Sequence, residues 1–291
     1  MDTVVGEYLA GLGLARNTVL AYRGDLARYL SYLAGLGVRD LGAVRGVDVG
    51  GFVRDLRDQG LAEASVARCL VAVRGLHRFA VRRGLVAVDV TRGVAVPSVP
   101  VRRAPVLSVQ RVEALFAAAS AGAAPFGVRD RALVELLYAG GARVSEAVGA
   151  DLAGVDLAVG TIRLGGGRVV PLAQSALVAL DAYLIRARPG LVASGGDGAA
   201  VFLNARGGRL SRQSGWAVLA GAAARMAPAD RISPRMLRSS FAAHLLDGGA
   251  DVRVVQELLG HSSVSTTRVH VRETSDRARQ VYSGSHPRAL D

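Results

Sequence analysis

Apolar residues in the first part of the chain recur every three or four positions, the spacing that is typical of amphipathic helices. In the clearest segment Leu26, Tyr29 and Leu33 share one face, and Gly35 follows as a helix stop signal. Two more helices are expected, over 47–59 and 61–83. The pattern therefore predicts a helical domain over residues 1–95.

Residues 96–107, VPSVPVRRAPVL, interrupt this pattern because they contain three of the nine prolines. Proline fixes φ and removes a backbone donor, so an extended segment is expected. We interpret 96–107 as an interdomain linker. Its adjacent Arg102 and Arg103 suit a protein that wraps around a duplex, and a plain exposed tether is the alternative.

Helical periodicity returns in residues 108–291, which we expect to form a second domain. Within it, TIRLGGGRVVPL (161–172) places two β-type runs on either side of three glycines, which predicts a hairpin. Residues 201–203 are a candidate third strand. Helices are expected over 108–119, 128–139, 211–226, 234–247 and 252–259, with a last one beginning near Ser265. The predicted fold class is mainly α, with one small antiparallel sheet in the second domain.

The charge of the chain favours a polyanionic partner. The 36 basic residues are all arginine and outnumber the 24 acidic residues, which gives a net charge of +12. A codon bias that replaces lysine by arginine is the alternative explanation of this composition. However, seven arginines lie within 206–238 against Asp230 alone, and a codon bias does not cluster charge in this way. We therefore expect nucleic acid as the partner.

Several classes of protein are excluded by the same sequence. The longest uncharged apolar stretch falls short of the roughly 18 residues that a membrane span needs. The first residues do not resemble a signal peptide, so we expect a cytoplasmic protein without membrane association. The single Cys69 gives neither a disulfide framework nor a thiol metal site, and we expect no metal or other cofactor.

Four segments together resemble the tyrosine recombinases of the phage integrase family, and among them the Xer branch. They are RDRALVELLYAGGARVSEAV (129–148), RVVPL (168–172), SPRMLRSSFAAHLLDGGADVRVVQELLGHSSVSTT (233–267) and HPRA (286–289). The resemblance implies a helical, SAM-like core-binding domain and a catalytic domain that together clamp duplex DNA. It also implies a reaction without metal, in which a tyrosine hydroxyl attacks a phosphodiester and forms a 3′-phosphotyrosyl link.

The positions that hold the phosphate in this family are retained. Arg143 in GARVSE and Arg238 in MLRSSF stand at the two catalytic arginines, and His261 in LGHSS stands at the histidine that donates to the same phosphate. Paired guanidinium groups suit two nonbridging phosphate oxygens. The alternative for Arg143 is an ion pair with Glu146, which lies one helical turn away.

The positions that supply the nucleophile and exchange protons are replaced. His270 stands where the family has its tyrosine, and Arg235 stands at the family's histidine, three residues before Arg238. The family's hairpin lysine is absent, because the turn is GGG and the chain contains no lysine. Arg163 or Arg168 can supply charge there, but a guanidinium does not give up its proton.

Two residues are alternative nucleophiles. Tyr282 lies 12 residues beyond His270, about 18 Å away along a helix, and His270 itself could form a phosphohistidine. Neither restores the missing acid. The leading hypothesis is therefore a DNA-binding recombinase with impaired cleavage. An active recombinase that uses Tyr282 or His270 is one alternative, and a noncatalytic DNA-binding regulator or architectural protein is another.

Five arginines are candidate DNA contacts: Arg102, Arg103, Arg168, Arg209 and Arg212. We expect the only tryptophan, Trp216, to be packed rather than stacked on a base, and His77 and His244 to lie in or at the edge of a core. In the family the terminal segment docks into a neighbouring subunit. The terminal HPRALD therefore predicts assembly on DNA with another copy or with a related recombinase.

Overall fold

The computed structural model describes residues 1–98, 104–193, 195–196, 198–226, 231–260, 281–282 and 284–288. The chain divides into two compact units, Met1–Arg102 and Arg103–Asp291, which are considered separately below. The division falls inside the segment 96–107 that the prolines single out as a linker.

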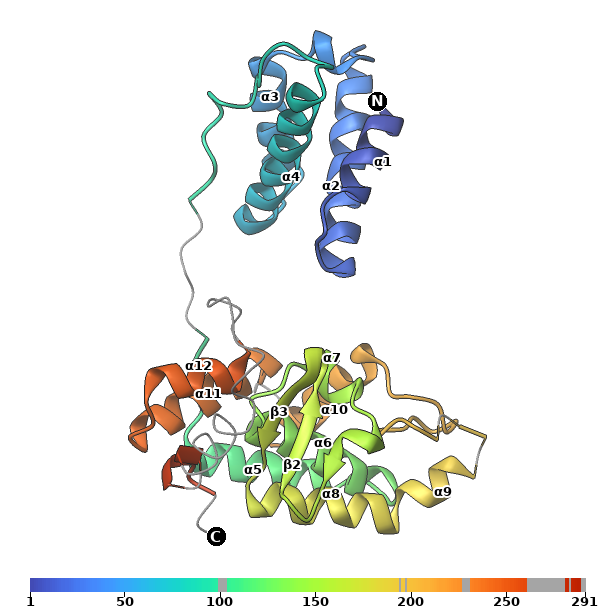
Figure 1. The fold of residues 1–291 in the computed structure, drawn as a ribbon, viewed down its shortest axis with the longest axis vertical. Helices are drawn as coiled ribbons and strands as arrows, with labels where there is room; N and C mark the ends of the chain where they lie inside the picture. Colours follow the sequence, from blue (N-terminus) through green and yellow to red (C-terminus); the bar gives the residue numbers. More distant parts are fainter. Residues whose placement is uncertain are drawn as a thin grey trace. The chain divides into compact units, whose positions relative to one another are not determined.

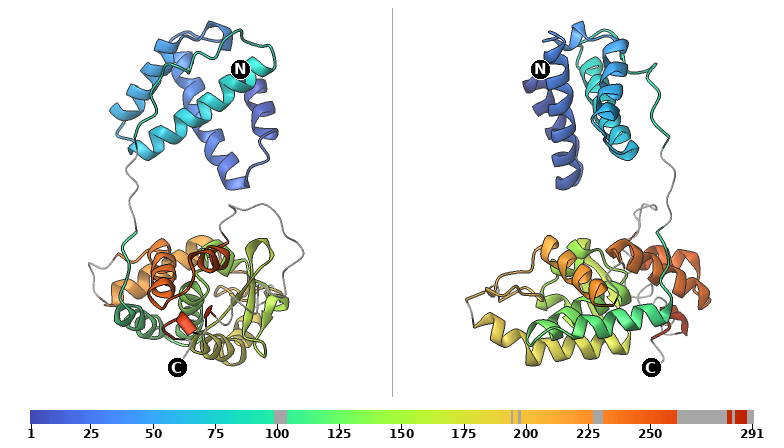
Figure 2. Two further views of the ribbon diagram at one scale, coloured as in Figure 1. Left: turned by 60° about the vertical axis from the view of Figure 1, so that its left-hand side comes forward. Right: turned by 180° about the vertical axis from the view of Figure 1, so that it is seen from behind.

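The first unit is helical over its described part (Figure 1). Its elements are α1 (Asp2–Ala10), α2 (Arg16–Gly35), a 3₁₀ turn η1 (Leu41–Ala43), α3 (Gly46–Asp58) and α4 (Glu63–Arg82). Helices α2 and α4 cross (Figure 2) and bury Leu26, Tyr29 and Leu76 completely between them and α3. The three helices expected from the apolar spacing are present within a few residues of their predicted bounds, and α1 is an additional one.

The segment that follows α4 belongs to this first core. Val86, Val90 and Val94 pack against its buried residues, and the guanidinium of Arg74 donates to the carbonyl of Val94. His77 is fully buried, and its Nε2 lies 2.9 Å from the Tyr29 hydroxyl, as expected for a core histidine.

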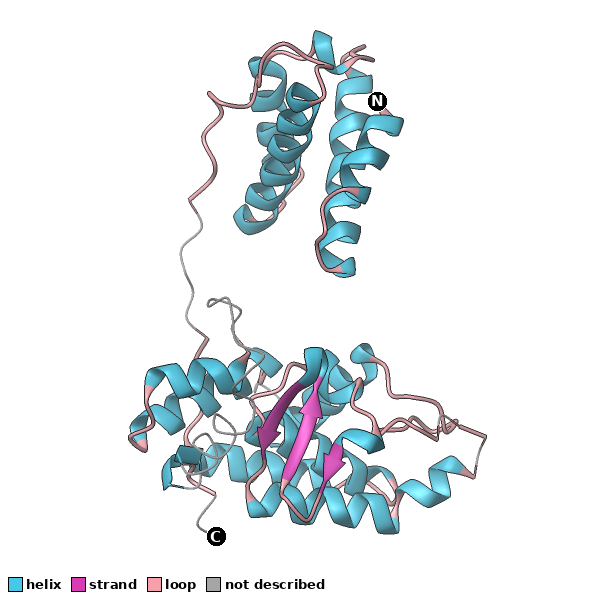
Figure 3. Cartoon of the chain, viewed as in Figure 1, coloured by secondary structure: helices cyan, strands magenta, loops and turns pink. Residues whose placement is uncertain are grey.

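The second unit is mostly helical and carries a small sheet on one side, drawn in magenta in Figure 3. Its helices are α5 (Val109–Ser120), α6 (Phe126–Ala139), α7 (Val144–Val148), α8 (Gln174–Arg186), α9 (Arg188–Val192), α10 (Arg212–Met226), α11 (Pro234–Asp247) and α12 (Val252–Leu259). Two 3₁₀ turns, η2 (Leu152–Gly154) and η3 (Gly165–Gly167), flank the strands. Helix α6 packs against α5, α8, α10 and α11, so it forms the centre of this core.

The sheet is antiparallel and has the order β1-β2-β3, with strands β1 (Val155–Asp156), β2 (Thr161–Leu164) and β3 (Arg168–Pro171). The predicted hairpin is β2–β3, with Leu164 opposite Arg168 and the three glycines in the turn. Gly166 has a φ of 76°, a conformation that favours glycine.

The candidate third strand over 201–203 is wrong. The strand that joins the hairpin is β1, whereas 201–203 makes only isolated bridges, from Ala200 to Asp151 and from Leu203 to Arg209. The backbone groups of this segment bond to 150–152 on one side and to 208–210 on the other, so they are not available to the sheet.

The end of the expected linker is part of the second core. Leu107 is buried, and its backbone N–H donates to Ser240 Oγ on α11 over 2.8 Å. Ser108 then caps α5, as predicted, by accepting a hydrogen bond from the backbone N–H of Arg111. The proline-rich segment is therefore fixed at this end by apolar burial and a side-chain hydrogen bond.

None of the described helices combines the length and the apolar character that a membrane span requires.

Two helical glycines in the second unit provide a test of this packing. A Cβ added to Gly127 on α6 would lie 2.2 Å from the Gly122 carbonyl oxygen and 2.7 Å from that of Ser120, both backbone atoms. At Gly221 on α10 it would meet only the tip of the Arg225 side chain, at 3.7 Å. We expect Gly127→Ala to lower the free energy of unfolding by about 2–3 kcal/mol. Gly221→Ala should raise it by up to about 1 kcal/mol, because alanine is the better helix former.

Urea denaturation of the full chain measures both effects on the second unit. Equal changes in the two variants would contradict the close backbone approach at Gly127.

Candidate functional site

The start of α7 brings an arginine and a glutamate together. Arg143 precedes the first residue of α7, and Glu146 lies in the first helical turn. The backbone N–H of Arg143 donates to Glu146 Oε2 over 2.8 Å, and its Nη1 donates to Oε1 over 2.8 Å. A carboxylate in this place accepts from an otherwise unpaired helix N–H and favours the positive end of the helix dipole. The local sequence RVSE therefore fixes the Arg143–Glu146 pair.

Two further arginines reach the same carboxylate from distant elements. Arg168 Nη2, at the start of β3, lies 2.7 Å from Glu146 Oε2, and Arg238 Nη1, on α11, lies 3.9 Å from the same oxygen. The hairpin and α11 thus place Arg168 and Arg238 beside the Arg143–Glu146 pair. We name Arg143, Arg168, Arg238 and Glu146 the arginine cluster.

The arginine cluster also binds the end of α12. The Arg238 guanidinium donates to the Gly141 carbonyl over 2.5 Å and to the Leu259 carbonyl, and Arg168 donates to the Leu258 carbonyl. Gly260, which has a φ of 63°, ends α12, and a Cβ there would lie 2.9 Å from Cδ of Arg168. Gly260 is therefore needed both for the left-handed turn and for the close approach of Arg168.

Positive charge dominates the arginine cluster. Three guanidinium groups face one carboxylate, which leaves an excess of two positive charges. Burial, with the charge of Arg143 next in size, lowers the pKa of Arg238 to about 10. Burial likewise lowers the pKa of Arg168. Cations whose charge is only partly compensated in a low dielectric are stabilised by an added anion.

The carboxylate in the arginine cluster remains ionised. Burial alone would raise the pKa of Glu146, but the backbone N–H of Arg143 and the charges of Arg168 and Arg143 together lower it. The Arg143 side chain is 54% exposed, whereas those of Arg168 and Arg238 are 12% and 14% exposed. The cluster can therefore receive an anion on the side of Arg143 and hold it near the two buried cations.

The structure brings the predicted Arg143 and Arg238 together and adds Arg168, which the sequence indicated as a DNA contact and, with Arg163, as a possible source of charge at the hairpin. The sequence predicts Glu146 as a partner of Arg143, and in the structure three arginines converge on it. The signal that could have identified it is an acidic residue three positions after an arginine at a helix start.

Other predicted site residues are exposed on helices or fall outside the described residues. Arg235 is exposed on the first turn of α11, one turn before Arg238. Arg212 is exposed at the first residue of α10. Four predicted residues fall outside the described residues: Arg102, Arg103, His261 and His270.

Arg209, a predicted DNA contact, makes several contacts within its own unit. Its guanidinium donates to the carbonyls of Val148 and Ala150 and lies 2.6 Å from Asp151 Oδ1. These contacts attach the loop before α10 to the end of α7.

The prediction of a packed Trp216 is wrong, because its side chain is 55% exposed. Gly215, Leu219 and Ala222 occupy the buried face of α10, and Trp216 lies just beyond the edge of that face. The indole and Arg212, one turn earlier, are therefore both on the accessible surface of α10.

Tyr282 is buried in the second core and does not present its hydroxyl for attack. Only 2% of the residue is exposed. Its hydroxyl donates to the Ala139 carbonyl over 3.1 Å and accepts from the Ala173 backbone N–H over 3.0 Å. Burial raises the pKa of Tyr282 far above its usual range, which further disfavours ionisation. This geometry argues against Tyr282 as an alternative nucleophile.

The segment around Tyr282 is held against α11. The His286 ring stacks on Tyr282 with a centroid distance of 4.6 Å, and a Cβ on Gly248, at the end of α11, would lie 2.1 Å from the Ser285 carbonyl oxygen. His244 on α11 is buried and lies 2.8 Å from the Tyr138 hydroxyl, as expected for a core histidine. The described part of the C-terminal segment thus packs on its own chain.

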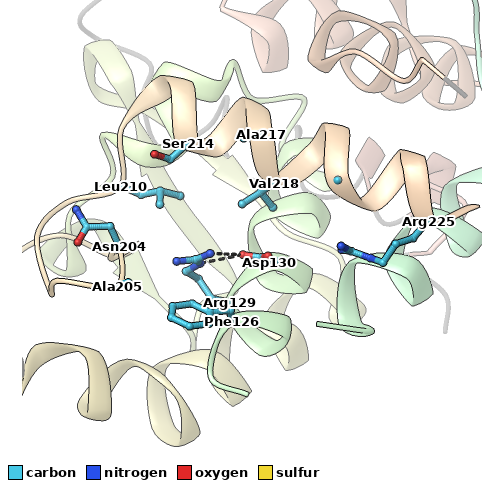
Figure 4. A pocket seen from close by; sticks show the side chains of 11 residues that line it. Phe126, Arg129, Asp130, Asn204, Ala205, Leu210, Ser214, Ala217, Val218 and Arg225 are labelled. Carbon is cyan, nitrogen blue, oxygen red and sulfur yellow. Dashed lines mark hydrogen bonds and ion pairs between the residues drawn. The ribbon is translucent and has the colours of Figure 1, made fainter. Parts of the chain in front are cut away.

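A separate pocket of about 420 Å³ lies between α6, α10 and the loop that precedes α10 (Figure 4). Arg129 there donates to Asp130 Oδ1 through Nε and Nη2, at 2.8 and 2.7 Å, and through Nη1 to the Leu203 carbonyl. Arg225 also lines the pocket, so its wall holds two arginines against Asp130 and an excess of one positive charge. The arginine cluster has an excess of two and therefore favours an anion more strongly.

Comparison with known proteins identifies the family. Residues 105–277 match the phage integrase family, and residues 6–84 match the phage integrase N-terminal SAM-like domain. The chain therefore belongs to the phage integrase family, and within it to the Xer-like tyrosine recombinases. The predicted SAM-like helical domain, followed by a mostly helical catalytic domain with a small antiparallel sheet, is confirmed.

Two relatives are similar over almost their whole length. The tyrosine recombinase XerD of Mycobacterium tuberculosis (strain ATCC 25618 / H37Rv) is 50% identical over 292 residues, which cover 95% of this chain and 94% of that protein. The tyrosine recombinase XerD of Corynebacterium glutamicum is 46% identical over 288 residues, with the same coverage of both chains.

Two solved structures share the fold. A lambda integrase dimer bound to a COC′ core site has a TM-score of 0.69 and 18% identity, covering 99% of this chain and 96% of that chain. The Tn1549 transposon integrase in complex with circular intermediate DNA has a TM-score of 0.69 and 17% identity, covering 96% and 98%.

Removal of the Tyr282 hydroxyl should affect stability. Tyr282→Phe leaves the Ala173 N–H and the Ala139 carbonyl without this partner in the core, so we expect the free energy of unfolding to fall by about 2–3 kcal/mol. Among the described residues the Tyr183 hydroxyl accepts from one buried N–H, that of Leu203, so Tyr183→Phe is the matched comparison and its loss should be smaller. Chemical denaturation measures both, and a fully stable Tyr282→Phe protein would contradict this placement.

Stability should also fall with acid because of His286. Burial, and then the charges of His244 and Arg288, lower the pKa of His286 from 6.5 to about 3. His286 is therefore protonated in the unfolded state and neutral in the folded state over this pH range. The free energy of unfolding decreases as the pH falls from 6.5 towards 3.

His286→Phe keeps an aromatic ring on Tyr282 and removes this titration. As the pH falls from about 6 to about 4, the free energy of unfolding of the parent protein should decrease more steeply than that of the variant. The expected difference in slope is about 1.4 kcal/mol per pH unit. Denaturation at a series of pH values tests this, and an unchanged slope would rule out His286 as the source.

Proposed function

We propose that this protein is a site-specific DNA recombination protein that binds duplex DNA and whose own strand cleavage is impaired. The observation that carries the proposal is the convergence of Arg143, Arg168 and Arg238 on one carboxylate, with an excess of two positive charges. In a member of the phage integrase family, a DNA phosphate is the anion that such a cluster fits best.

The arginines have different roles in the proposed binding of phosphate. The exposed Arg143 guanidinium donates to one nonbridging oxygen, while Arg238, oriented by the carbonyls of Gly141 and Leu259, supplies charge from the buried side. Arg168 compensates Glu146 and keeps that carboxylate from repelling the phosphate. His261, the residue after Gly260, is proposed as a further donor.

Impaired cleavage is proposed because of residue chemistry. Attack on phosphorus needs a nucleophile and a proton for the departing 5′ oxygen. His270 replaces the tyrosine, Arg235 replaces a histidine that titrates near neutrality, and no lysine is present in the chain. An arginine keeps its proton, so Arg168 cannot act as the missing acid. The burial of Tyr282 supports the absence of a substitute nucleophile.

The relatives suggest how the protein assembles. Lambda integrase has been solved as a dimer bound to a core site and as a tetramer bound to a Holliday junction. By analogy we propose that this cytoplasmic protein assembles on duplex DNA with further copies or with a related, active recombinase. The surface of α10 that carries Arg212 and Trp216, together with Arg102 and Arg103, is proposed to contact the DNA.

A nicked suicide duplex, which traps covalent intermediates, tests both parts of the proposal. The purified protein should bind the duplex in a gel-shift assay and give no covalent adduct on a denaturing gel. A restored variant that combines His270→Tyr, Arg235→His and a lysine inserted into the Gly165–Gly167 turn should form an adduct, because it regains the nucleophile and the acid groups. Adding Arg238→Ala to that variant is the control and should abolish the adduct.

A covalent adduct from the unaltered protein would overturn the proposed impairment. Failure to bind duplex DNA would overturn the proposed function as a whole.

A further inference from the structure

A buried carboxylate links two helices of the first unit. Asp25, in the middle of α2, is 1% exposed. Cys69 Sγ on α4 donates to its Oδ1 over 3.1 Å, and Arg68 Nη1, also on α4, lies 3.0 Å from its Oδ2. Arg28 Nη1, one turn along α2, lies 3.7 Å from Oδ1. Two arginines from neighbouring helices are thus attached to one internal acid.

Packing of α2 against α4 does not by itself explain an aspartate at this position. Removing a carboxylate from water costs several kcal/mol unless partners compensate it, and apolar residues of similar volume usually serve a core equally well. The compensation of Asp25 comes largely from Arg28 and Arg68, whose side chains remain 54% and 41% exposed. The acid is internal, while the cations it orients lie at the surface.

The surface beside these cations is open. Gly24 precedes Asp25, is exposed, and lies one turn from Arg28 on α2; a Cβ built on it would meet nothing within 4 Å. An external backbone can therefore approach this part of α2 without displacing a side chain. Each guanidinium has five N–H donors, so donors remain after the contact with Asp25.

The charge balance favours an anionic ligand. Arg28 and Arg68 carry two positive charges against one negative charge on Asp25. Burial, reinforced by the hydrogen bond to Asp25, raises the pKa of the Cys69 thiol to about 11, so the thiol is a neutral donor. One positive charge remains in excess, on two guanidinium groups that lie beside one buried carboxylate.

We propose that Asp25 is a positioning residue that holds Arg28 and Arg68 as a paired phosphate clamp on α2 and α4, and that the ligand of this clamp is the backbone of duplex DNA. This proposal rests on the DNA binding proposed above. A guanidinium already held by a buried acid loses less side-chain freedom when it binds, so the phosphate contact is stronger. The contact is to the backbone, so it orients the first unit on DNA without reading sequence.

Other ion pairs of the same unit offer a contrast. Arg57 lies 2.7 Å from Glu63, but the two side chains are 45% and 47% exposed. Arg57 also donates to the second oxygen of Glu63 over 2.9 Å, so one acid neutralises one arginine and no positive charge is left in excess. Arg57→Ala therefore removes the same charge as Arg28→Ala without removing a cation that is held by an internal acid.

A binding assay tests the clamp. Fluorescence anisotropy measures binding of the full-length protein to a short linear duplex of random sequence over a series of salt concentrations. Arg28→Ala and Arg68→Ala should each weaken binding about fivefold and reduce the slope of log affinity against log salt by about 0.9. Asp25→Asn adds one unit of positive charge to the protein, yet we expect it to weaken binding by a similar factor, because both guanidinium groups lose their orientation.

Two controls separate positioning from stability and from total charge. Cys69→Ala removes a hydrogen-bond donor from the same carboxylate, so it should lower the melting temperature and leave affinity and salt slope unchanged. Arg57→Ala should change binding less than twofold. If Asp25→Asn does not fold, the two exposed arginine variants still decide the question.

The inference is overturned if a folded Asp25→Asn protein binds as tightly as the parent or more tightly. It is also overturned if Cys69→Ala reduces affinity as much, or if Arg28→Ala and Arg68→Ala behave like Arg57→Ala. In each case binding by the parent protein would leave the proposed function intact, whereas loss of parental binding would overturn that function first.

Discussion

The carboxylate of Glu146 is the interaction on which the second unit is organised. It faces arginines from the start of α7, from β3 and from α11, and two of them continue to the carbonyls at the end of α12. Four separate stretches of chain are therefore fixed by one negative charge. Three cations surround it in a partly buried site, so the cluster keeps an excess of positive charge that favours the binding of a further anion.

This arrangement separates two parts of phosphoryl chemistry that are usually found together. Holding a phosphate requires fixed positive charge, which arginine supplies over the whole physiological pH range. Breaking a phosphodiester also requires a nucleophile and groups that exchange protons. Arg143 and Arg238 meet the first requirement, whereas His270 and Arg235 stand where the family meets the second. The proposed combination of DNA binding with impaired cleavage rests on that difference in chemistry.

Buried acids have a similar organising effect in both units. Glu146 orients arginines in the second unit, and Asp25 orients Arg28 and Arg68 in the first. In a chain with a net charge of +12, neighbouring arginines repel one another unless an acid lies between them. An internal carboxylate reduces that repulsion locally and selects the direction in which a guanidinium points, which total charge alone does not determine.

Apolar periodicity, glycine turns and family resemblance predicted α2 to α6, α10 to α12, the β2–β3 hairpin and the pairing of Arg143 with Arg238, because these signals are local or carried by motifs. They did not predict α1, α7, α8 or α9. Four further features became visible with the packed chain: three arginines converge on Glu146, Tyr282 is buried, Trp216 is exposed, and 201–203 lies outside the sheet. These outcomes depend on which distant backbone groups and apolar faces meet. The pattern of residues along one segment does not identify the distant residues that this segment contacts in the folded chain. Those contacts form only when the elements pack together.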